Sequence, residues 1–127
     1  MSKLYIIGET NCRGEIRTEK FAIEKHMVIA DLQKAKTLVG DETKLERLFD
    51  DIEDEYGYGN GKGQAVISLI QSDFQDADMT TFIDSNIEKI NNEELISIEL
   101  EETIYGMSNT KEKALLAFHN IDDNDWE

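Results

Sequence analysis

The segment from residue 41 to residue 63, DETKLERLFDDIEDEYGYGNGKG, contains the clearest structural signal of the chain. Its apolar side chains recur at the spacing i, i+3, i+4 and i+7, which places them on one face of an α-helix. These side chains are Leu45, Leu48, Phe49, Ile52 and Tyr56. Thr43 and Glu46 fit a capping box at the beginning, and the glycine-rich segment 57–63 ends the pattern. The sequence therefore predicts an amphipathic helix over residues 41–56.

Residues 95–105, LISIELEETIY, alternate between apolar and polar side chains. Such alternation is typical of a β-strand with one buried face and one face in water. The apolar set is Ile96, Ile98, Leu100 and Ile104. We therefore predict one strand over this segment, ended by Gly106, with an acidic outer face.

The remaining segments predict the other elements of a mixed fold. Residues 3–9 and 15–24 are rich in β-branched and aromatic residues and predict an antiparallel hairpin. Residues 64–70, QAVISLI, are apolar on both faces, as in a buried strand. Helical spacing recurs over residues 27–39, 79–90 and 109–121. The predicted order of elements is β-β-α-α-β-α-β-α.

These elements predict a single α+β domain, in which an N-terminal hairpin and further strands form one sheet packed with about four helices. The length of 127 residues fits one domain, which we place at 1–121, with a frayed acidic tail at 122–127. The one cysteine, Cys12, excludes an internal disulfide and fits a reducing compartment. Neither a signal peptide nor a membrane-spanning run is expected. We therefore expect a cytoplasmic protein.

The charge of the chain is strongly negative and unevenly placed. The 28 acidic and 13 basic residues leave a net charge of −15. Residues 1–40 hold seven bases and five acids, a net charge of +2, whereas residues 41–127 hold six bases and 23 acids, a net charge of −17. This balance argues against direct binding to nucleic acid or to an anionic membrane surface. It favours a cationic partner instead.

No motif in the sequence predicts catalysis, a metal or a cofactor. The glycine run does not match a phosphate-binding loop, because Gly63 follows Lys62 where serine or threonine is required. The acidic run at 50–55 does not match a calcium loop, because position 56 is Tyr rather than Gly. His26, His119 and Cys12 do not occur at the spacing of a catalytic or metal-binding motif. We therefore expect a protein that is not an enzyme and that needs no cofactor.

The acidic residues of the helix at 41–56 form the strongest functional signal. Eight of the fifteen residues from 41 to 55 are acidic, against the bases Lys44 and Arg47. Like charges four residues apart destabilise a helix, and acids near its C-terminus oppose the helix dipole. A local cost without a local gain indicates a functional surface. The predicted partner-binding residues are Glu46, Asp50, Asp51, Glu53, Asp54, Glu55 and Tyr58.

The leading hypothesis is an acidic stoichiometric inhibitor, an immunity protein or antitoxin. It would neutralise a basic nuclease-type toxin by electrostatic complementarity, because a nuclease site is cationic. One alternative is a phage-type DNA-mimic inhibitor of a restriction or CRISPR nuclease, which needs carboxylates along an extended line. Another is a small enzyme or ligand-binding domain whose site comes from residues distant in sequence. The strand at 95–105 offers a second mode of contact, because an exposed strand edge can pair with a partner's strand.

Overall fold

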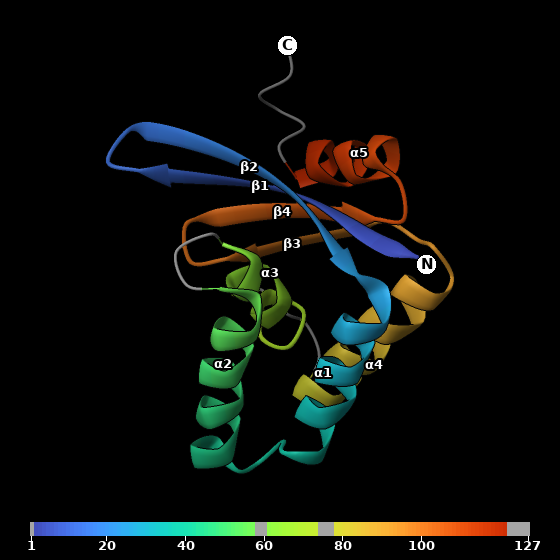
Figure 1. Ribbon diagram of the computed structural model, residues 1–127. Helices are drawn as coiled ribbons and strands as arrows, with labels where there is room; N and C mark the ends of the chain where they lie inside the picture. The colour runs from blue at the N-terminus through green and yellow to red at the C-terminus, as the bar shows by residue number, and fades with distance from the viewer. Residues whose placement is uncertain (1, 58–60, 74–77, 122–127) are drawn as a thin grey trace.

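A computed structural model describes residues 2–57, 61–73 and 78–121 (Figure 1). The elements follow in the order β1 (Lys3–Cys12), β2 (Glu15–Glu24), α1 (Lys25–Thr37), α2 (Glu42–Tyr56), α3 (Lys62–Ser68), α4 (Met79–Asn91), β3 (Ile96–Leu100), β4 (Thr103–Ser108) and α5 (Lys111–Ile121). Strands and helices form one α+β domain, which confirms the predicted class. The predicted tail at 122–127 lies outside the described residues.

The four strands form one antiparallel sheet in the order β2-β1-β4-β3. β1 pairs with β2 from Lys3 opposite Glu24 to Cys12 opposite Glu15, so the predicted hairpin is present. β1 also pairs with β4, and β4 pairs with β3. The two edges of the sheet are therefore β2 and β3.

Helices lie on both faces of the sheet, with α1, α2, α3 and α4 on one side and α5 on the other (Figure 1). Because side chains alternate along a strand, β1 buries Leu4 and Ile6 on the first face and Ile7 on the second. Leu4 and Ile6 belong to the large core, which includes Ile52 of α2. Ile7 belongs to a small cluster with Ala114 and Phe118 of α5. The sheet thus separates two surfaces of the protein.

The prediction of a buried strand at 64–70 is wrong, because these residues form most of helix α3 and the turn after it. Ala65, Val66, Leu69 and Ile70 are all fully buried. The segment is enclosed on several sides, so it lacks the polar face that distinguishes an amphipathic helix. A short, wholly apolar run does not distinguish a strand from a helix.

The prediction of one strand at 95–105 is also wrong in detail, because the segment is a hairpin of β3 and β4. Leu100 pairs with Thr103, so Glu101 and Glu102 form the turn, and Glu101 has a φ of 56°. The turn changes which face the later residues occupy. Ile96, Ile98 and Leu100 lie in the large core, whereas Ile104 packs against the cluster beneath α5.

The observed order is therefore β-β-α-α-α-α-β-β-α, with five helices where about four were expected. The predicted helices at 27–39, 41–56, 79–90 and 109–121 correspond to α1, α2, α4 and α5, with small shifts at their ends. In the part of the chain that the structure describes, no helix combines the length and the apolar character needed to cross a membrane.

Candidate functional site: the acidic helix α2

Helix α2 presents the predicted division between a buried apolar face and an exposed acidic surface. Leu45, Leu48 and Ile52 are buried in the core. The predicted partner-binding residues Glu46, Asp50, Asp51, Asp54 and Glu55 are exposed, and Glu53 is half-buried. Tyr58, the last member of the predicted set, lies outside the described residues.

The ends of α2 are fixed by residues on either side of it. Asp41, rather than Thr43, is the N-cap, because its Oδ1 accepts a hydrogen bond from the backbone N–H of Lys44 at 3.1 Å. The helix stops at Gly57, whose φ of 93° suits glycine and whose N–H donates to the carbonyl oxygen of Glu53 at 2.8 Å. The last turn contains no basic residue. Asp54 and Glu55 therefore face the negative end of the helix dipole without compensation.

The carboxylates of α2 outnumber the two bases of the same helix, Lys44 and Arg47, by seven to two. In the ranges 2–57, 61–73 and 78–121, the one ion pair that involves α2 joins Lys44 Nζ to Asp41 Oδ2 at 3.9 Å. Both side chains of that pair are largely exposed, so the pair contributes little. The two bases offset only part of the acidic charge, so the helix keeps a net charge of −5 and a negative field. This field extends into solvent over about one Debye length, roughly 10 Å at moderate salt.

The six described acids point in three directions, because each residue of a helix is rotated by about 100° from the one before it. Asp50 and Asp54 point away from the buried face. Glu46 and Glu53 lie on one flank, and Asp51 and Glu55 lie on the other. The surface is therefore a band around the helix rather than a single line of charge.

Glu53 lies at the edge of a cleft of about 290 Å³ between α2, α3 and the sheet. Helix α3 approaches closely here, since a Cβ on Gly63 would lie 3.0 Å from the Cα of Glu53. The other lining side chains come mainly from strands, and the full lining is Gly8, Thr10, Glu19, Phe21, Glu53, Gly61, Gln64, Thr103 and Tyr105. Two carboxylates, an amide and hydroxyl groups make this cleft rich in acceptors for a cationic side chain. The sequence did not predict that Glu19 and Glu53 line the same cleft, because their proximity depends on the tertiary fold.

The opposite flank of α2 carries a carboxylate cluster with α1. The Tyr56 hydroxyl donates a hydrogen bond to Asp31 Oδ2 at 3.0 Å. Burial raises the pKa of Asp31 to about 6; the Tyr56 hydrogen bond opposes that rise and the neighbouring Glu55 adds to it. Burial and Asp31 also raise the pKa of Tyr56, so the phenol stays a donor. Nothing in the sequence indicated this contact between residues 25 positions apart.

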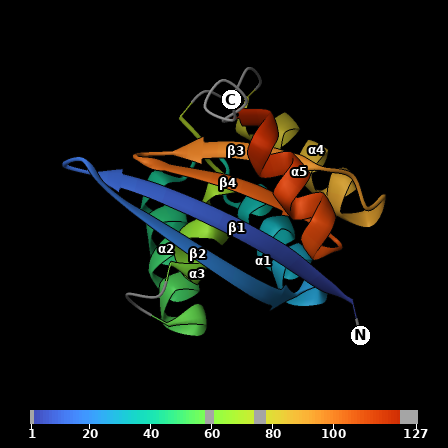
Figure 2. The ribbon, with the colours of Figure 1, turned by 90° about the horizontal axis from the view of Figure 1, so that it is seen from above.

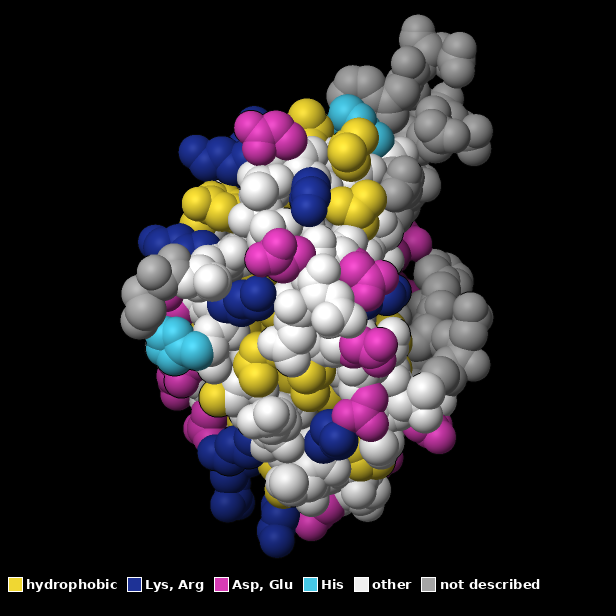
Figure 3. Space-filling model, turned by 90° about the vertical axis from the view of Figure 1, so that its right-hand side faces the viewer, with side chains coloured by type: hydrophobic (Ala, Val, Ile, Leu, Met, Phe, Trp, Pro, Cys, Tyr) yellow, Lys and Arg dark blue, Asp and Glu magenta, His cyan; other side chains and the backbone are white. Residues whose placement is uncertain are grey.

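The side of the molecule that carries α1, α4 and α5 has a different character. Figure 3 shows basic, acidic and hydrophobic side chains interspersed on that side. One close pair there joins Lys36 Nζ to Asp84 Oδ1 at 2.5 Å. This side therefore lacks the dense run of acidic residues that α2 carries, seven in the fifteen residues of one helix.

The cysteine and the two histidines lie on three different elements, with Cys12 on β1, His26 on α1 and His119 on α5. His26 is exposed at the beginning of α1, and Cys12 ends β1. Within the described ranges, no group of three or more His, Cys, Asp or Glu residues is arranged to hold a metal ion. Comparisons of this chain with protein families, with curated proteins and with solved structures found no match.

Proposed function

We propose that the protein is an acidic binding protein that uses the outer surface of α2 to engage a basic protein partner. The specific form that we propose is a cytoplasmic stoichiometric inhibitor, an immunity protein or antitoxin directed against a nuclease-type toxin. The single observation that supports this proposal is the set of exposed α2 carboxylates, which lack basic neighbours within ion-pair distance among the described residues apart from the Lys44–Asp41 pair.

The physical basis of the proposal is electrostatic complementarity. A nuclease binds phosphate and therefore presents a cationic surface. A band of carboxylates on a rigid helix attracts that surface at long range and raises the association rate by up to about a thousandfold at low salt. The cleft beside Glu53 and Glu19 adds a place where an arginine or lysine of the partner can be received.

The two alternatives receive less support. A duplex DNA mimic needs charges along an extended line, about one per 1.7 Å of axis, whereas the α2 acids are spread around one helix. An enzyme needs a reactive group beside a substrate site. The cleft contains carboxylates and hydroxyl groups, but Glu19 is exposed and Glu53 is half-buried, so neither carboxylate is enclosed away from water.

The test is a charge reversal on the outer surface of α2. The triple variant Asp50→Lys, Asp51→Lys and Asp54→Lys is compared with a control, Glu88→Lys, Glu94→Lys and Glu102→Lys, whose exposed side chains lie outside α2. Both variants change the net charge equally. The partner is the purified product of the adjacent gene, and association rates are measured at about 0.05 M and about 0.5 M NaCl, which differ strongly in screening.

We expect the α2 triple variant to lose at least about a hundredfold in affinity, mostly in the association rate, and the control to lose less than about threefold. Inhibition of the partner's nuclease activity should saturate at one inhibitor per nuclease. Equal effects of the two triple variants, or an association rate independent of salt, would reject the acidic helix as the binding surface. Competition with duplex DNA for a host nuclease would favour the mimic instead.

A further inference from the structure

The face of the sheet that carries α5 is only half covered. Neighbouring strands are about 4.8 Å apart and a helix with its side chains is about 10 Å wide, so one helix covers about two strands. α5 packs mainly against β4, with further contacts to β1 and β3. Figure 2 shows β2 and much of β1 without a helix above them. The uncovered strip is about as wide as one helix.

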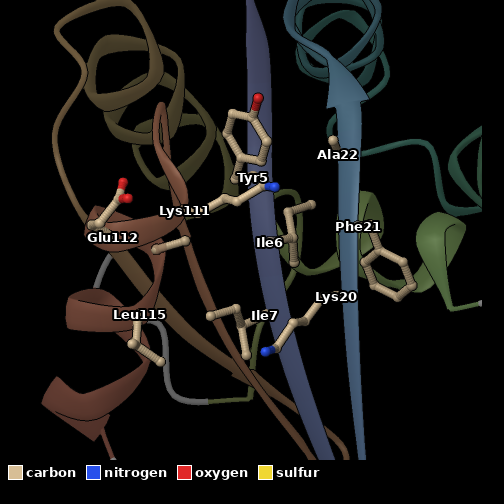
Figure 4. A pocket seen from close by; sticks show the side chains of 10 residues that line it. Tyr5, Ile6, Ile7, Lys20, Phe21, Ala22, Lys111, Glu112 and Leu115 are labelled. Carbon is tan, nitrogen blue, oxygen red and sulfur yellow. The ribbon is translucent and has the colours of Figure 1, made fainter.

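This uncovered strip forms a groove of about 620 Å³ between α5 and the two N-terminal strands. Tyr5 and Ile7 of β1 and Ala22 of β2 contribute to its floor, and Ala114 and Leu115 of α5 to one wall. Figure 4 shows Tyr5, Ala22 and Leu115 around the space between α5 and β2. Leu115 is 42% exposed, so its apolar surface is available to a ligand in the groove. The lining is predominantly apolar, as in ligand and peptide grooves.

Two lysines reach over the groove, one from the edge strand β2 and one from α5. Lys20 extends from β2 and Lys111 extends from α5, and both side chains lie over β1 in Figure 4. Glu112 is the one acidic side chain among the lining residues. Among the described residues, neither lysine belongs to an ion pair within 4.0 Å. The lining of the groove therefore has a net charge of +1, opposite in sign to the −15 of the whole chain.

We propose that the groove binds an acidic amphipathic helix of a partner protein, which lies beside α5 on β1 and β2. The width of the strip suits one helix, which would complete the layer that α5 begins. Apolar residues of the helix at i, i+3, i+4 and i+7 pack on Tyr5, Ile7 and Leu115. Acidic residues that border its apolar face meet Lys20 and Lys111, whose flexible side chains move aside from β1 to pair with them. The groove lies across the sheet from α2, so this inference is independent of the proposed function.

The charge of the groove separates this partner from other occupants. A basic helix would place its cations against Lys20 and Lys111, so it is rejected by repulsion. A second copy of this chain offers no free acidic helix, because α2 buries Leu45, Leu48 and Ile52 in its own core. A long-chain carboxylate, like the acidic helix, combines an apolar part with an anionic group. The experiment therefore tests such a carboxylate as well as helical peptides.

The experiment titrates the full-length, isotope-labelled chain with two designed helical peptides and follows amide NMR shifts. Both peptides carry leucine at i, i+3, i+4 and i+7; one carries glutamate on the flanks and the other lysine. The test variant is Lys20→Glu with Lys111→Glu. The matched control is Arg17→Glu with Arg47→Glu, an equal change of charge at exposed positions outside the groove lining.

We expect the glutamate peptide to shift the signals of Tyr5, Ala22 and Leu115, and the test variant to weaken its binding at least about tenfold. The control variant should bind as the natural chain does. The proposal is overturned if the glutamate peptide does not bind at millimolar concentration or if the lysine peptide binds equally well. It is also overturned if the shifts lie outside the groove, if the chain alone self-associates through it, or if dodecanoate binds there and the peptide does not.

Discussion

Helices α2 and α5 lie on opposite faces of one sheet and meet solvent in different ways. α2 exposes carboxylates opposite its buried apolar face and along both flanks of the helix. α5 buries Ala114 and Phe118 but leaves Leu115 and Leu116 42% and 56% exposed beside an uncovered half of the sheet. Charge on α2 acts at long range and directs encounter, whereas apolar area beside α5 acts only on contact. The net charge of the chain therefore describes neither surface, and the two faces are suited to different partners.

The largest expected difference between the two regions is in the cost of losing an apolar side chain. Ile52 of α2 is 1% exposed, so Ile52→Ala should leave a cavity and lower the free energy of unfolding by about 4 kcal/mol. Leu115→Ala at the groove should cost no more than about 0.5 kcal/mol, because the side chain already meets water. Urea denaturation followed by circular dichroism measures both. An equal loss of stability at the two positions would contradict the description of Leu115 as a partly exposed side chain that lines an open groove.

A backbone contact distinguishes the attachment of α5 from that of α2. A Cβ on Gly106 of β4 would lie 2.2 Å from the backbone nitrogen of Phe118, so Gly106→Ala forces α5 away from the sheet. We expect a loss of about 3 kcal/mol in the free energy of unfolding. The control Gly40→Ala meets no atom within 4 Å and should cost about 1 kcal/mol, from its φ of 93° alone. NMR signals of α2 should stay in place in the Gly106 variant; loss of both helices would contradict separate attachment.

The sequence predicted α2 well and the hairpin of β3 and β4 poorly, for physical reasons. α2 has one buried and one solvated side, so its residues record the helical period directly. The turn at Glu101 and Glu102 contains no Gly, Asn or Pro, the residues that normally indicate a two-residue turn. The alternation of apolar and polar residues continues across this turn, so the sequence of residues 95–105 predicted one strand. Residues 64–70 have no solvated side, so their apolar residues do not recur at a spacing that distinguishes a helix from a strand.

The members of the candidate site differ in the same way. Exposure of Asp50 and Asp54 followed from helical spacing alone. The position of Glu53 at a cleft with Glu19, and the contact of Tyr56 with Asp31, depend on how helices pack on the sheet. The groove beside α5 was not predicted, because an uncovered strip of sheet is a property of helix placement. Its one local signal was the positive charge of residues 1–40, which include Lys20.

The carboxylate cluster of Asp31, Glu55 and Tyr56, between α1 and α2, should make the stability of the protein depend on pH. The folded protein raises the pKa of Asp31 from an ordinary 3.8 to about 6, so the folded state binds this proton more tightly than the unfolded state. The contribution of Asp31 to stability therefore increases as the pH falls through about 6 and is fully gained below the unfolded value. Allowing for solvent screening, we expect about 1 kcal/mol.

The measurement compares the natural chain with Asp31→Asn, which keeps an acceptor for Tyr56 but cannot titrate. The stability of the natural chain relative to this variant should be greater at about pH 5 than at about pH 7.5, since protonation relieves the penalty on Asp31. Because other carboxylates are common to both proteins, the difference isolates Asp31. A difference that is constant over this range would contradict the role of the cluster.

The smallest expected effect concerns the local cost of acids on α2. Asp54 lies in the last turn of α2 and four residues from Asp50, so Asp54→Lys reverses an unfavourable dipole contact and an unfavourable charge pair. We expect the free energy of unfolding to rise by about 0.5 kcal/mol, while affinity for the basic partner falls. Glu112→Lys in the first turn of α5 should have the opposite sign, because an acid is favourable at that end of a helix. A stabilised Asp54→Lys protein that binds its partner less well would show that α2 retains its charge for binding rather than for folding. Loss of stability in both variants would instead make the α2 acids an ordinary solvated surface.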